Sequence, residues 1–458
     1  MSAVQASPTA KGSRPRDPVR AVQHVLYRAA KADPGRRFHA LSDKVYRRDV
    51  LRRAWVAVRE NNGAPGIDHV TLAEVEEYGV DRLLDELASE LKDGRYRPMP
   101  ARRVLIPKSG MKDQYRPLSI PVVRDRVVQA AMKIVLEPVF EADFLPCSFG
   151  FRPKRSAHDA LQVLIDEQVR GRRWVVETDI ADCFSAIPHD ELMQAIEERV
   201  CDQSMLKLLR AMLRAGAMED GQVRRPVTGT PQGGPVSPLL CNVYLHRLDR
   251  AWDDGDGVLV RFADDLVVMC WSQGQAERAL ARLVELLAEL GLRPKAAKTR
   301  IVHLQHGGEG LDFLGFHHRL ARSKQRKGRQ PVLFLARWPA DKAMRHARDR
   351  IRELTRFTSK WPFSVIVEDL NLFLRGWAAF FRFGHSHRQF AKIRFYAAER
   401  LALLIARRHT RDRVYGWRVL ARSSPSYLGL VTLSGIIVTP RPNRYWRGKP
   451  NVGGERRR

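Results

Sequence analysis

Cysteine is scarce in this sequence of 458 residues, and its pattern excludes two classes of protein. There are five cysteines, an odd number, and they stand far apart without any C-x-x-C pair. This usage argues against a disulfide framework and against a structural zinc site, so we expect reduced cysteines in the protein core. His303 with His306 forms an H-x-x-H, and His317 is followed by His318, but neither has cysteine or carboxylate neighbours that favour zinc.

Long hydrophobic runs are also missing. No apolar stretch approaches membrane-spanning length, and no signal-peptide core follows the first charged residues. We therefore expect a cytosolic protein without a membrane partner. The first residues are rich in Ser, Pro, Lys and Arg, and residues 1–45 are predicted to be a basic, largely disordered extension.

Acidic residues are sparse in the last third of the chain. Residues 317–458 contain 33 Lys and Arg against 8 Asp and Glu, a net charge of +25, whereas residues 1–316 carry only +4. Such a charge opposes compact folding unless a polyanion neutralises it, so the expected partner is a nucleic acid. An anionic membrane surface is the weaker alternative, because no segment combines a basic face with a sustained lipid-facing stripe.

The periodicity of apolar residues predicts an α+β fold. Helical spacing is found in residues 51–96, where a Gly/Pro turn separates two helices, and again in 125–144 and 275–292. Short β-rich runs occur at 100–121, at 173–187 and around residue 264. From about residue 340 the pattern is helical, with an amphipathic helix in 387–409 whose outer face is basic. The final forty residues give no clear pattern.

The stretch RFADDLVVMC places Asp264 and Asp265 between two runs typical of buried strands. Taken alone, the pair is better explained as a hairpin tip with polar residues in solvent. A second acidic position changes this interpretation, because Asp179 ends another apolar strand 85 residues earlier. Three carboxylates at adjacent strand ends repel one another unless divalent cations lie between them, and oxygen ligands favour Mg²⁺. Two such ions support phosphoryl transfer, which is polymerase chemistry.

These residues carry a resemblance to a known family. RFADDLVV resembles the [YF]-x-D-D motif of reverse transcriptases, and TDIADCF resembles their first metal-binding motif. The stretches IPKSGMKDQYRPLSIP, FGFRPKRSAHDAL, TPQGGPVSPLLCNVYLHRLD, LRPKAAKTRIV and LDFLGF follow the family's order of fingers and palm blocks. LNLFLRGWAAFFRFG, at 370–384, is similar to the maturase segment of bacterial group II intron proteins. The sequence is thus identified as resembling a group II intron reverse transcriptase/maturase.

The resemblance implies a set of site residues. The catalytic and metal-binding residues would be Asp179, Asp264 and Asp265, with the carbonyl of Ile180 as a further metal ligand and Lys298 as the general acid. The implied nucleotide-binding residues are Lys108, Arg116, Ile180, Ala181, Asp182, Cys183, Phe184, Gln232 and Gly233. The implied primer or template contacts are Phe313, Leu314, Gly315 and Phe316. For each there is a plainer alternative: surface charge for Lys108, Arg116 and Lys298, a bare turn for Gly233, and core packing for the phenylalanines.

The resemblance also implies the architecture of a right hand. Fingers and palm would occupy residues 46–318, a linker and helical thumb with the maturase segment 319–410, and a basic RNA- or DNA-binding tail 411–458. The aromatic residues Trp377, Phe380, Phe381 and Phe383 are expected in the thumb core rather than as base-stacking platforms. Because no cysteine follows Cys270, the sequence resembles the branch that lacks the C-terminal endonuclease.

The implied function is RNA-directed DNA synthesis with two Mg²⁺ ions, together with maturase binding of intron RNA that assists splicing and retromobility. The implied partners are group II intron RNA, an RNA template with a DNA primer, and dNTPs. The location would be the cytoplasm, with nucleoid association during action on DNA, and the oligomeric state is left open. Two other functions stay open: an RNA-binding splicing cofactor without polymerase activity, and a reverse transcriptase recruited to a host role such as phage defence.

Overall fold

The computed structural model describes residues 17–107, 115–219, 222–224, 227–230, 233–323, 331–357, 361–422 and 428–442. The chain folds into two compact units whose segments alternate along the sequence. The first unit contains residues 1–106, 117–146 and 182–250, and the second contains 107–116, 147–181 and 251–458. The predicted fingers and palm are therefore divided between both units, and the predicted thumb lies wholly in the second.

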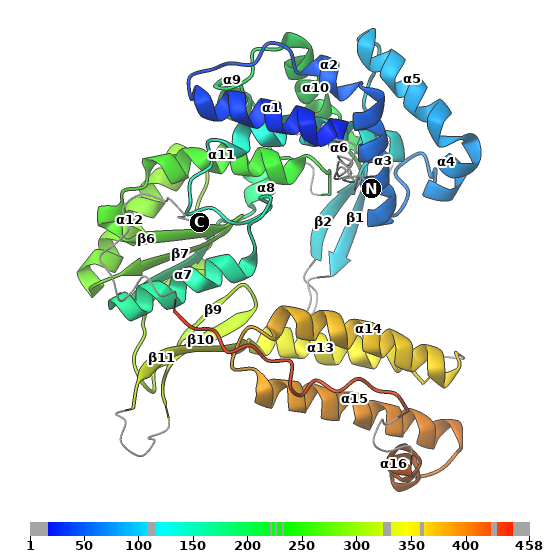
Figure 1. The fold of residues 1–458 in the computed structure, drawn as a ribbon, viewed down its shortest axis with the longest axis vertical. Coiled ribbons are helices and arrows are strands. Elements are labelled where there is room, and N and C mark those ends of the chain that lie inside the picture. The colour runs from blue at the N-terminus through cyan, green and yellow to red at the C-terminus, as the bar shows by residue number, and fades with distance from the viewer. Residues whose placement is uncertain are drawn as a thin grey trace, which may run out of the picture. The chain divides into compact units, whose positions relative to one another are not determined.

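The first unit is mostly helical (Figure 1). Its helices are α1 (Pro18–Ala32), α2 (Ser42–Val45), α3 (Arg48–Asn61), α4 (Leu72–Tyr78), α5 (Val80–Lys92), α6 (Val123–Glu141), α8 (Cys183–Ala186), α9 (His189–Glu197), α10 (Gln203–Arg214) and α11 (Ser237–Ala251). Helix α6 is buried along most of its length, and α1 and α3 pack against it. A small sheet in the order β2-β1-β4-β5 contains β1 (Ala101–Pro107), β2 (Tyr115–Ile120), β4 (Ala217–Glu219) and β5 (Gln222–Arg224).

The second unit is built on an antiparallel sheet in the order β6-β7-β3-β8. Its strands are β3 (Trp174–Asp179), β6 (Val258–Phe262), β7 (Asp265–Cys270) and β8 (Arg300–His303). The two central strands, β3 and β7, are almost entirely apolar on the covered side, and helices α7 (Ala157–Arg170) and α12 (Gln273–Glu289) pack on the sheet. Helix α7 begins with a capping box, in which Ser156 and Asp159 satisfy each other's backbone N–H groups.

A second sheet connects this layer to the C-terminal helices. Its order is β11-β10-β9, with β9 (Leu311–Phe313), β10 (Phe316–Arg322) and β11 (Leu333–Pro339). The helices are α13 (Asp341–Leu354), α14 (Phe363–Phe381), α15 (His387–Arg408) and α16 (Arg413–Arg422), and the first three lie side by side (Figure 1).

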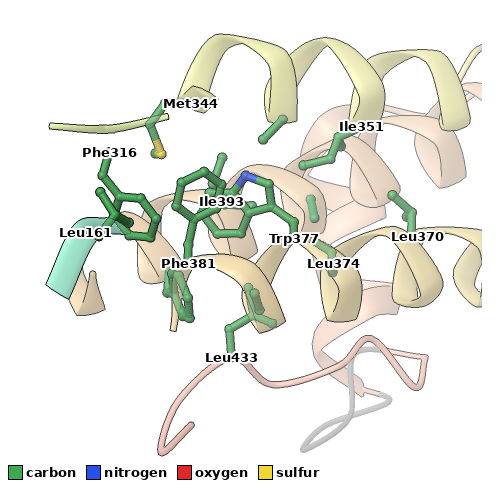
Figure 2. Packing of buried hydrophobic residues seen from close by; sticks show 14 of the residues in the cluster. Leu161, Phe316, Met344, Ile351, Leu370, Leu374, Trp377, Phe381, Ile393 and Leu433 are labelled. Atoms are coloured by element: carbon green, nitrogen blue, oxygen red, sulfur yellow. The ribbon is translucent and has the colours of Figure 1, made fainter. Parts of the chain in front are cut away.

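The core of the second unit is continuous from the sheets into these helices. Phe316 at the start of β10 is fully buried and contacts Phe381 of α14, with ring centroids 4.9 Å apart. The ring of Trp377 contacts that of Phe381, beside it in Figure 2, with centroids 5.0 Å apart. It also contacts Phe390, with centroids 5.2 Å apart. Trp377 and Phe381 are thus core residues, as predicted, whereas Phe380 remains 36% exposed.

The prediction of a largely disordered extension over residues 1–45 is wrong for the part that the structure describes. Residues 17–45 contain α1 and α2, whereas residues 1–16 lie outside the described residues. Val19, Leu26 and Ala30 form a buried stripe on α1, and Asp17 caps the helix by accepting hydrogen bonds from the N–H groups of Val19 and Arg20. This stripe makes the helix amphipathic, so burial against α6 outweighs the basic composition.

Within the described residues, the longest and most apolar helices fall short of what a membrane span requires.

Candidate active site

The site is built on a tight hairpin between β6 and β7 of the second unit. Phe262 pairs with Asp265, which leaves only Ala263 and Asp264 in the turn. Ala263 has a φ of 56°, a left-handed conformation in which turns of this type usually carry glycine. The turn therefore holds a non-glycine residue in a disfavoured conformation, and the surrounding contacts have to maintain it.

Two contacts support this turn from beneath. Arg261 is fully buried and donates hydrogen bonds to the carbonyl of Ala263, at 3.2 Å, and to Oγ of Ser148, at 2.8 Å. Gly150 lies directly against the turn, since a Cβ at that position would stand 2.5 Å from the backbone nitrogen of Ala263. Ser148 and Gly150 both belong to residues 147–150, which pair with β6 through a hydrogen bond from the N–H of Phe149 to the carbonyl of Arg261.

The carboxylates meet at one edge of the sheet. Asp179, the last residue of β3, is the register partner of Asp265, the first residue of β7. Asp264 is adjacent, because its carbonyl accepts a 3.0 Å hydrogen bond from the N–H of Ile180. The predicted convergence of Asp179 with the Asp264–Asp265 pair is therefore present in the fold.

Lys298 is the cation that faces this group. It ends the short 3₁₀ helix η2 (Ala296–Lys298), and its Nζ lies 2.5 Å from Oδ2 of Asp179 and 4.0 Å from Oδ1 of Asp265. The preceding loop is fixed to the edge of β3 by hydrogen bonds from the N–H of Lys295 to the carbonyl of Asp179 and from Ala181 to Arg293. The lysine predicted as general acid thus contacts the predicted metal ligands directly.

The pKa shifts show that the three carboxylates of Asp179, Asp264 and Asp265 repel one another. Burial, with Asp179 and Asp264 nearby, raises the pKa of Asp265 to about 8. Burial and the Asp179 carboxylate also raise the pKa of Asp264. Burial acts on Asp179 in the same direction, but hydrogen bonds with Asp265 and Lys298 outweigh it and lower its pKa. The pKa of Lys298 is raised because these carboxylates outweigh its burial.

This arrangement fits a divalent cation. Oxygen donors at adjacent strand ends, too crowded for all to ionise without a counter-charge, are the donor set that Mg²⁺ prefers. Among the described residues, no group of three or more His, Cys, Asp or Glu side chains is placed so that it could hold a metal ion as it stands. The carboxylates are gathered at one edge, and in this structure the charge nearest to them is that of Lys298.

The predicted primer contact forms a second tight hairpin in the same unit. Phe313 pairs with Phe316, and the two turn residues Leu314 and Gly315 have φ values of 49° and 78°. This is the backbone of a type I′ turn. Phe313 and Phe316 are buried in the core, so Leu314 and Gly315 are the members of this set that remain accessible.

Other predicted nucleotide-binding residues lie in the first unit. Phe184 is half-buried on α8, and its carbonyl accepts a 2.7 Å hydrogen bond from the N–H of Thr230. Gly233 has a φ of 119°, and a Cβ there would stand 2.5 Å from the carbonyl oxygen of Ser119 on β2, so glycine is required. Asp182 is exposed and Cys183 is buried, 3.7 Å from the sulfur of Cys241.

The remaining predicted positions are placed as follows. Arg116 is an exposed residue of β2, assigned to the second unit. Ile180 is buried and Ala181 is half-buried, both directly after β3. Lys108 and Gln232 lie outside the described residues.

Sequence reasoning missed the residues that position the site. Ser148, Gly150 and Arg261 shape the turn that carries Asp264. A Cβ on Gly229 would stand 2.9 Å from Cα of Ser185, so glycine is needed where these two segments pack together. Two signals were available: an arginine inside an otherwise apolar strand, and glycines at Gly150 and Gly229 with no helix to terminate.

The fold, the carboxylates at its sheet edge and the matched family models agree. An antiparallel sheet with paired carboxylates at its edge, beside a helical C-terminal part, defines a polymerase of the right-hand class. A family model described as reverse transcriptase (RNA-dependent DNA polymerase) matches residues 106–318, and one described as group II intron, maturase-specific domain, matches residues 344–422.

Individual relatives support the same assignment. Protein YkfC of Escherichia coli (strain K12) is 35% identical over 356 residues, which cover 68% of this chain and 91% of YkfC. Group II intron-encoded protein LtrA of Lactococcus lactis subsp. cremoris is 44% identical over 167 residues, 36% of this chain and 28% of LtrA. Nuclear intron maturase 4, mitochondrial, of Arabidopsis thaliana is 29% identical over 217 residues, 47% of this chain and 25% of that protein. The chain thus spans most of YkfC but less than a third of LtrA and of the plant protein.

The chain belongs to the family of group II intron reverse transcriptases and maturases. The predicted fold class, family and enzyme class are confirmed. A reverse transcriptase domain implies nucleotidyl transfer that depends on a divalent metal, and a maturase domain implies binding of intron RNA.

Proposed function

We propose that this chain copies group II intron RNA into DNA at Asp179, Asp264 and Asp265, extending a DNA primer on an RNA template with dNTPs. The basic helical part after residue 340 binds the intron RNA and assists splicing and retromobility. The observation that carries the proposal is the register pairing of Asp179 with Asp265, with Asp264 hydrogen-bonded through its carbonyl to the residue after Asp179.

Asp179, Asp264, Asp265 and the carbonyl of Ile180 are proposed to hold two Mg²⁺ ions. When bound, such ions activate the primer hydroxyl and stabilise the charge on the leaving oxygen. The sheet edge contributes fixed geometry, because the β3–β7 register sets the positions of Asp179 and Asp265, and Asp264 lies in a turn of only two residues beside them.

Lys298 is proposed to hold the proton that the departing pyrophosphate receives. Its pKa is raised by the neighbouring carboxylates, so the ammonium stays protonated at neutral pH and is available as a general acid. Lys108 and Arg116 would bind the triphosphate, one as a point charge and the other as a forked donor. Phe184 would discriminate against a 2′-hydroxyl, and Gly233 would allow the backbone to approach the nucleotide.

The test is RNA-templated primer extension by the wild-type protein and by Asp264→Asn. We expect wild-type synthesis that requires Mg²⁺, and a loss of at least about a thousandfold in the variant, because a metal ligand is removed. The matched control is Asp254→Asn, an exposed carboxylate in η1 (Asp254–Asp256) that should extend primers at the wild-type rate. Absence of synthesis by the wild-type protein would leave the splicing cofactor without polymerase activity as the function.

A host role such as phage defence is the other alternative, and genomic context separates it from intron mobility. A catalytic intron RNA encoded beside the gene supports the proposal, whereas its absence favours recruitment to the host.

A further inference from the structure

A pocket of about 370 Å³ lies in the C-terminal part of the second unit, away from the carboxylates in sequence and on different elements. Helices α15 and α16 and the segment at 432–437 form its walls. Its floor is apolar: Phe390, Ala398 and Leu433 line it and are each 2–4% exposed. Figure 2 shows Leu433 reaching from this segment toward the helical core. A volume of this size is typical of sites for small organic groups.

One wall of the pocket is aromatic. The rings of Phe395 on α15 and Trp417 on α16 are stacked, with centroids 5.7 Å apart and an interplanar angle of 27°. Phe395 is nevertheless 60% exposed, so much of its surface is not covered by the fold. Close helix packing sets this geometry, because a Cβ on Gly416 would stand 2.0 Å from the carbonyl oxygen of Ala402. Glycine at that position lets α16 approach α15 and brings Trp417 beside Phe395.

The opposite side of the pocket is polar. The hydroxyls of Thr432 and Ser434 lie 2.8 Å apart, and both residues are exposed. Hydroxyl groups donate and accept hydrogen bonds, so they suit the mixed edge of a heterocycle. Arg394 and His387 also line the pocket and add nitrogen donors at its rim. An apolar floor, a stacking face and a hydroxyl edge together match a flat aromatic ring with polar substituents.

The charge around the pocket specifies an anionic occupant. Arg388 and Lys392 are exposed on one face of α15, close in sequence to the pocket residue Ala391, and residues 317–458 carry a net charge of +25. The nearby acid Glu399 is already paired with Arg413. A flat base carried on a phosphate backbone satisfies both the pocket and its surroundings, whereas an apolar peptide leaves the cations without a partner.

We propose that this pocket binds one unpaired RNA nucleotide, with its base stacked on Phe395 beside Trp417 and its edge toward Thr432 and Ser434. The phosphates on either side face the cations of α15. The proposal rests on the RNA binding proposed for the maturase part, and it adds a specific mode: the base must be unpaired, because a base in a duplex does not expose its face. The protein would then bind intron RNA through one unpaired base in the pocket as well as through contacts with its phosphates.

The experiment uses the full chain and a single-stranded oligouridine of about a dozen nucleotides, with a duplex of the same length for comparison. Phe395→Leu should weaken single-strand binding about tenfold or more, because one stacked base is lost, while Phe395→Tyr should retain it. The slope of log K against log salt should be unchanged in Phe395→Leu, since no phosphate contact is removed. Leu372→Ala on α14, which removes a side chain that is 73% exposed, is the control and should bind as the wild type does.

A second measurement does not depend on the variants folding. Oligouridine carrying 5-iodouridine, irradiated with the wild-type chain, should crosslink to Phe395 or Trp417, as located by mass spectrometry. Equal affinity of wild type and Phe395→Leu, or crosslinks only outside the pocket, would overturn this site while RNA binding itself stands. Failure of the wild-type chain to bind any RNA would overturn the site together with the proposed maturase role.

Discussion

At the scale of single residues, the active site is an arrangement of charges held against their mutual repulsion. Asp179 and Asp265 face each other across two hydrogen-bonded strands, and Asp264 lies next to both. Burial and these neighbours raise the pKa of Asp265 to about 8, against 3.8 for the free side chain. The crowded carboxylates are therefore destabilising without a counter-cation, which supports the proposal that they bind a divalent metal.

The loss of stability caused by the crowded carboxylates can be measured by comparing Asp265→Asn with the wild-type protein in the presence of EDTA. In the unfolded chain Asp265 releases its proton near pH 3.8, but in the folded protein only near pH 8, so raising the pH from about 4 to 8 favours unfolding. Asparagine removes this penalty. We expect the free energy of unfolding to rise by about 1 kcal/mol at pH 8, a modest gain because the side chain is 40% exposed and partly screened.

The gain should shrink as the pH is lowered toward 4, as measured by chemical denaturation across this range. Glu289→Gln, an exposed carboxylate at the end of α12, should leave the free energy of unfolding unchanged within about 0.5 kcal/mol. A variant less stable than wild type at pH 8 would mean that Asp265 is stabilised, rather than strained, by its neighbours.

At the scale of elements, the site depends on the hairpin between β6 and β7 and on the segment beneath it. The turn carries Ala263 at positive φ, and a buried arginine and a closely packed glycine hold it in place. Arg261 directs its guanidinium to the turn carbonyl, so the conformation of the turn and the position of Asp264 are coupled. This segment is the element through which a distant substitution would change the geometry of catalysis.

Gly150→Ala tests this coupling. The added methyl group would meet the backbone of Ala263 rather than a flexible side chain, so the turn must shift. We expect a destabilisation of about 1–3 kcal/mol and a loss of about a hundredfold in the rate of nucleotide incorporation. Gly376→Ala is the matched control, since its Cβ meets nothing within 4 Å inside α14, and it should stabilise the protein by up to about 1 kcal/mol. Full polymerase activity in Gly150→Ala would show that the turn tolerates the displacement.

The elements that the sequence predicts well are those with strong periodic patterns. The strand ending at Asp179, the hairpin at Asp264 and the helices after residue 340 occur where the apolar spacing indicates. Helices α1 and α16 were not predicted, because both are rich in basic residues and bury only a few side chains. Burial of those side chains depends on packing partners elsewhere in the chain, which composition does not reveal.

The residues of the candidate site also fall into predictable and unpredictable ones. The three aspartates were predictable, because charged residues at the ends of buried strands are unusual and here they match a motif of reverse transcriptases. Ser148, Gly150 and Arg261 were not, since their roles are contacts between segments more than a hundred residues apart, which only the three-dimensional structure brings together. For Lys108 and Gln232, which lie outside the described residues, the assigned roles remain predictions.

At the scale of the whole molecule, the positive charge is concentrated in the C-terminal third of the chain, as expected for a protein that binds a polyanion. The excess of +25 lies in residues 317–458, which contain the matched maturase domain and the proposed nucleotide pocket. Most of this charge is not neutralised within the described part of the chain, where the ion pairs of α13–α16 use only a few acids. We therefore expect the phosphates of bound RNA to neutralise the positive charge of residues 317–458.

The dependence of RNA affinity on salt concentration measures how many phosphates the protein neutralises. Log K should fall steeply with log salt, by about 0.7–0.9 for each phosphate contact, because bound counterions are released. Replacing both Arg388 and Lys392 by alanine should reduce the slope by about 1.4, whereas Leu372→Ala should leave it unchanged. A flat salt response of the wild-type chain would contradict the role assigned to the basic region.

The most direct test of the central claim, that the three aspartates bind the catalytic metal, is metal-specific rescue of Asp264→Cys. A thiolate binds Mg²⁺ poorly but softer ions well, so the variant should be inactive with Mg²⁺ and regain primer extension, by about tenfold or more, when Mn²⁺ or Cd²⁺ is added. Asp264→Ala should show no such rescue. Wild-type activity of Asp264→Cys with Mg²⁺ alone, or equal inactivity with every ion, would contradict metal binding at this residue.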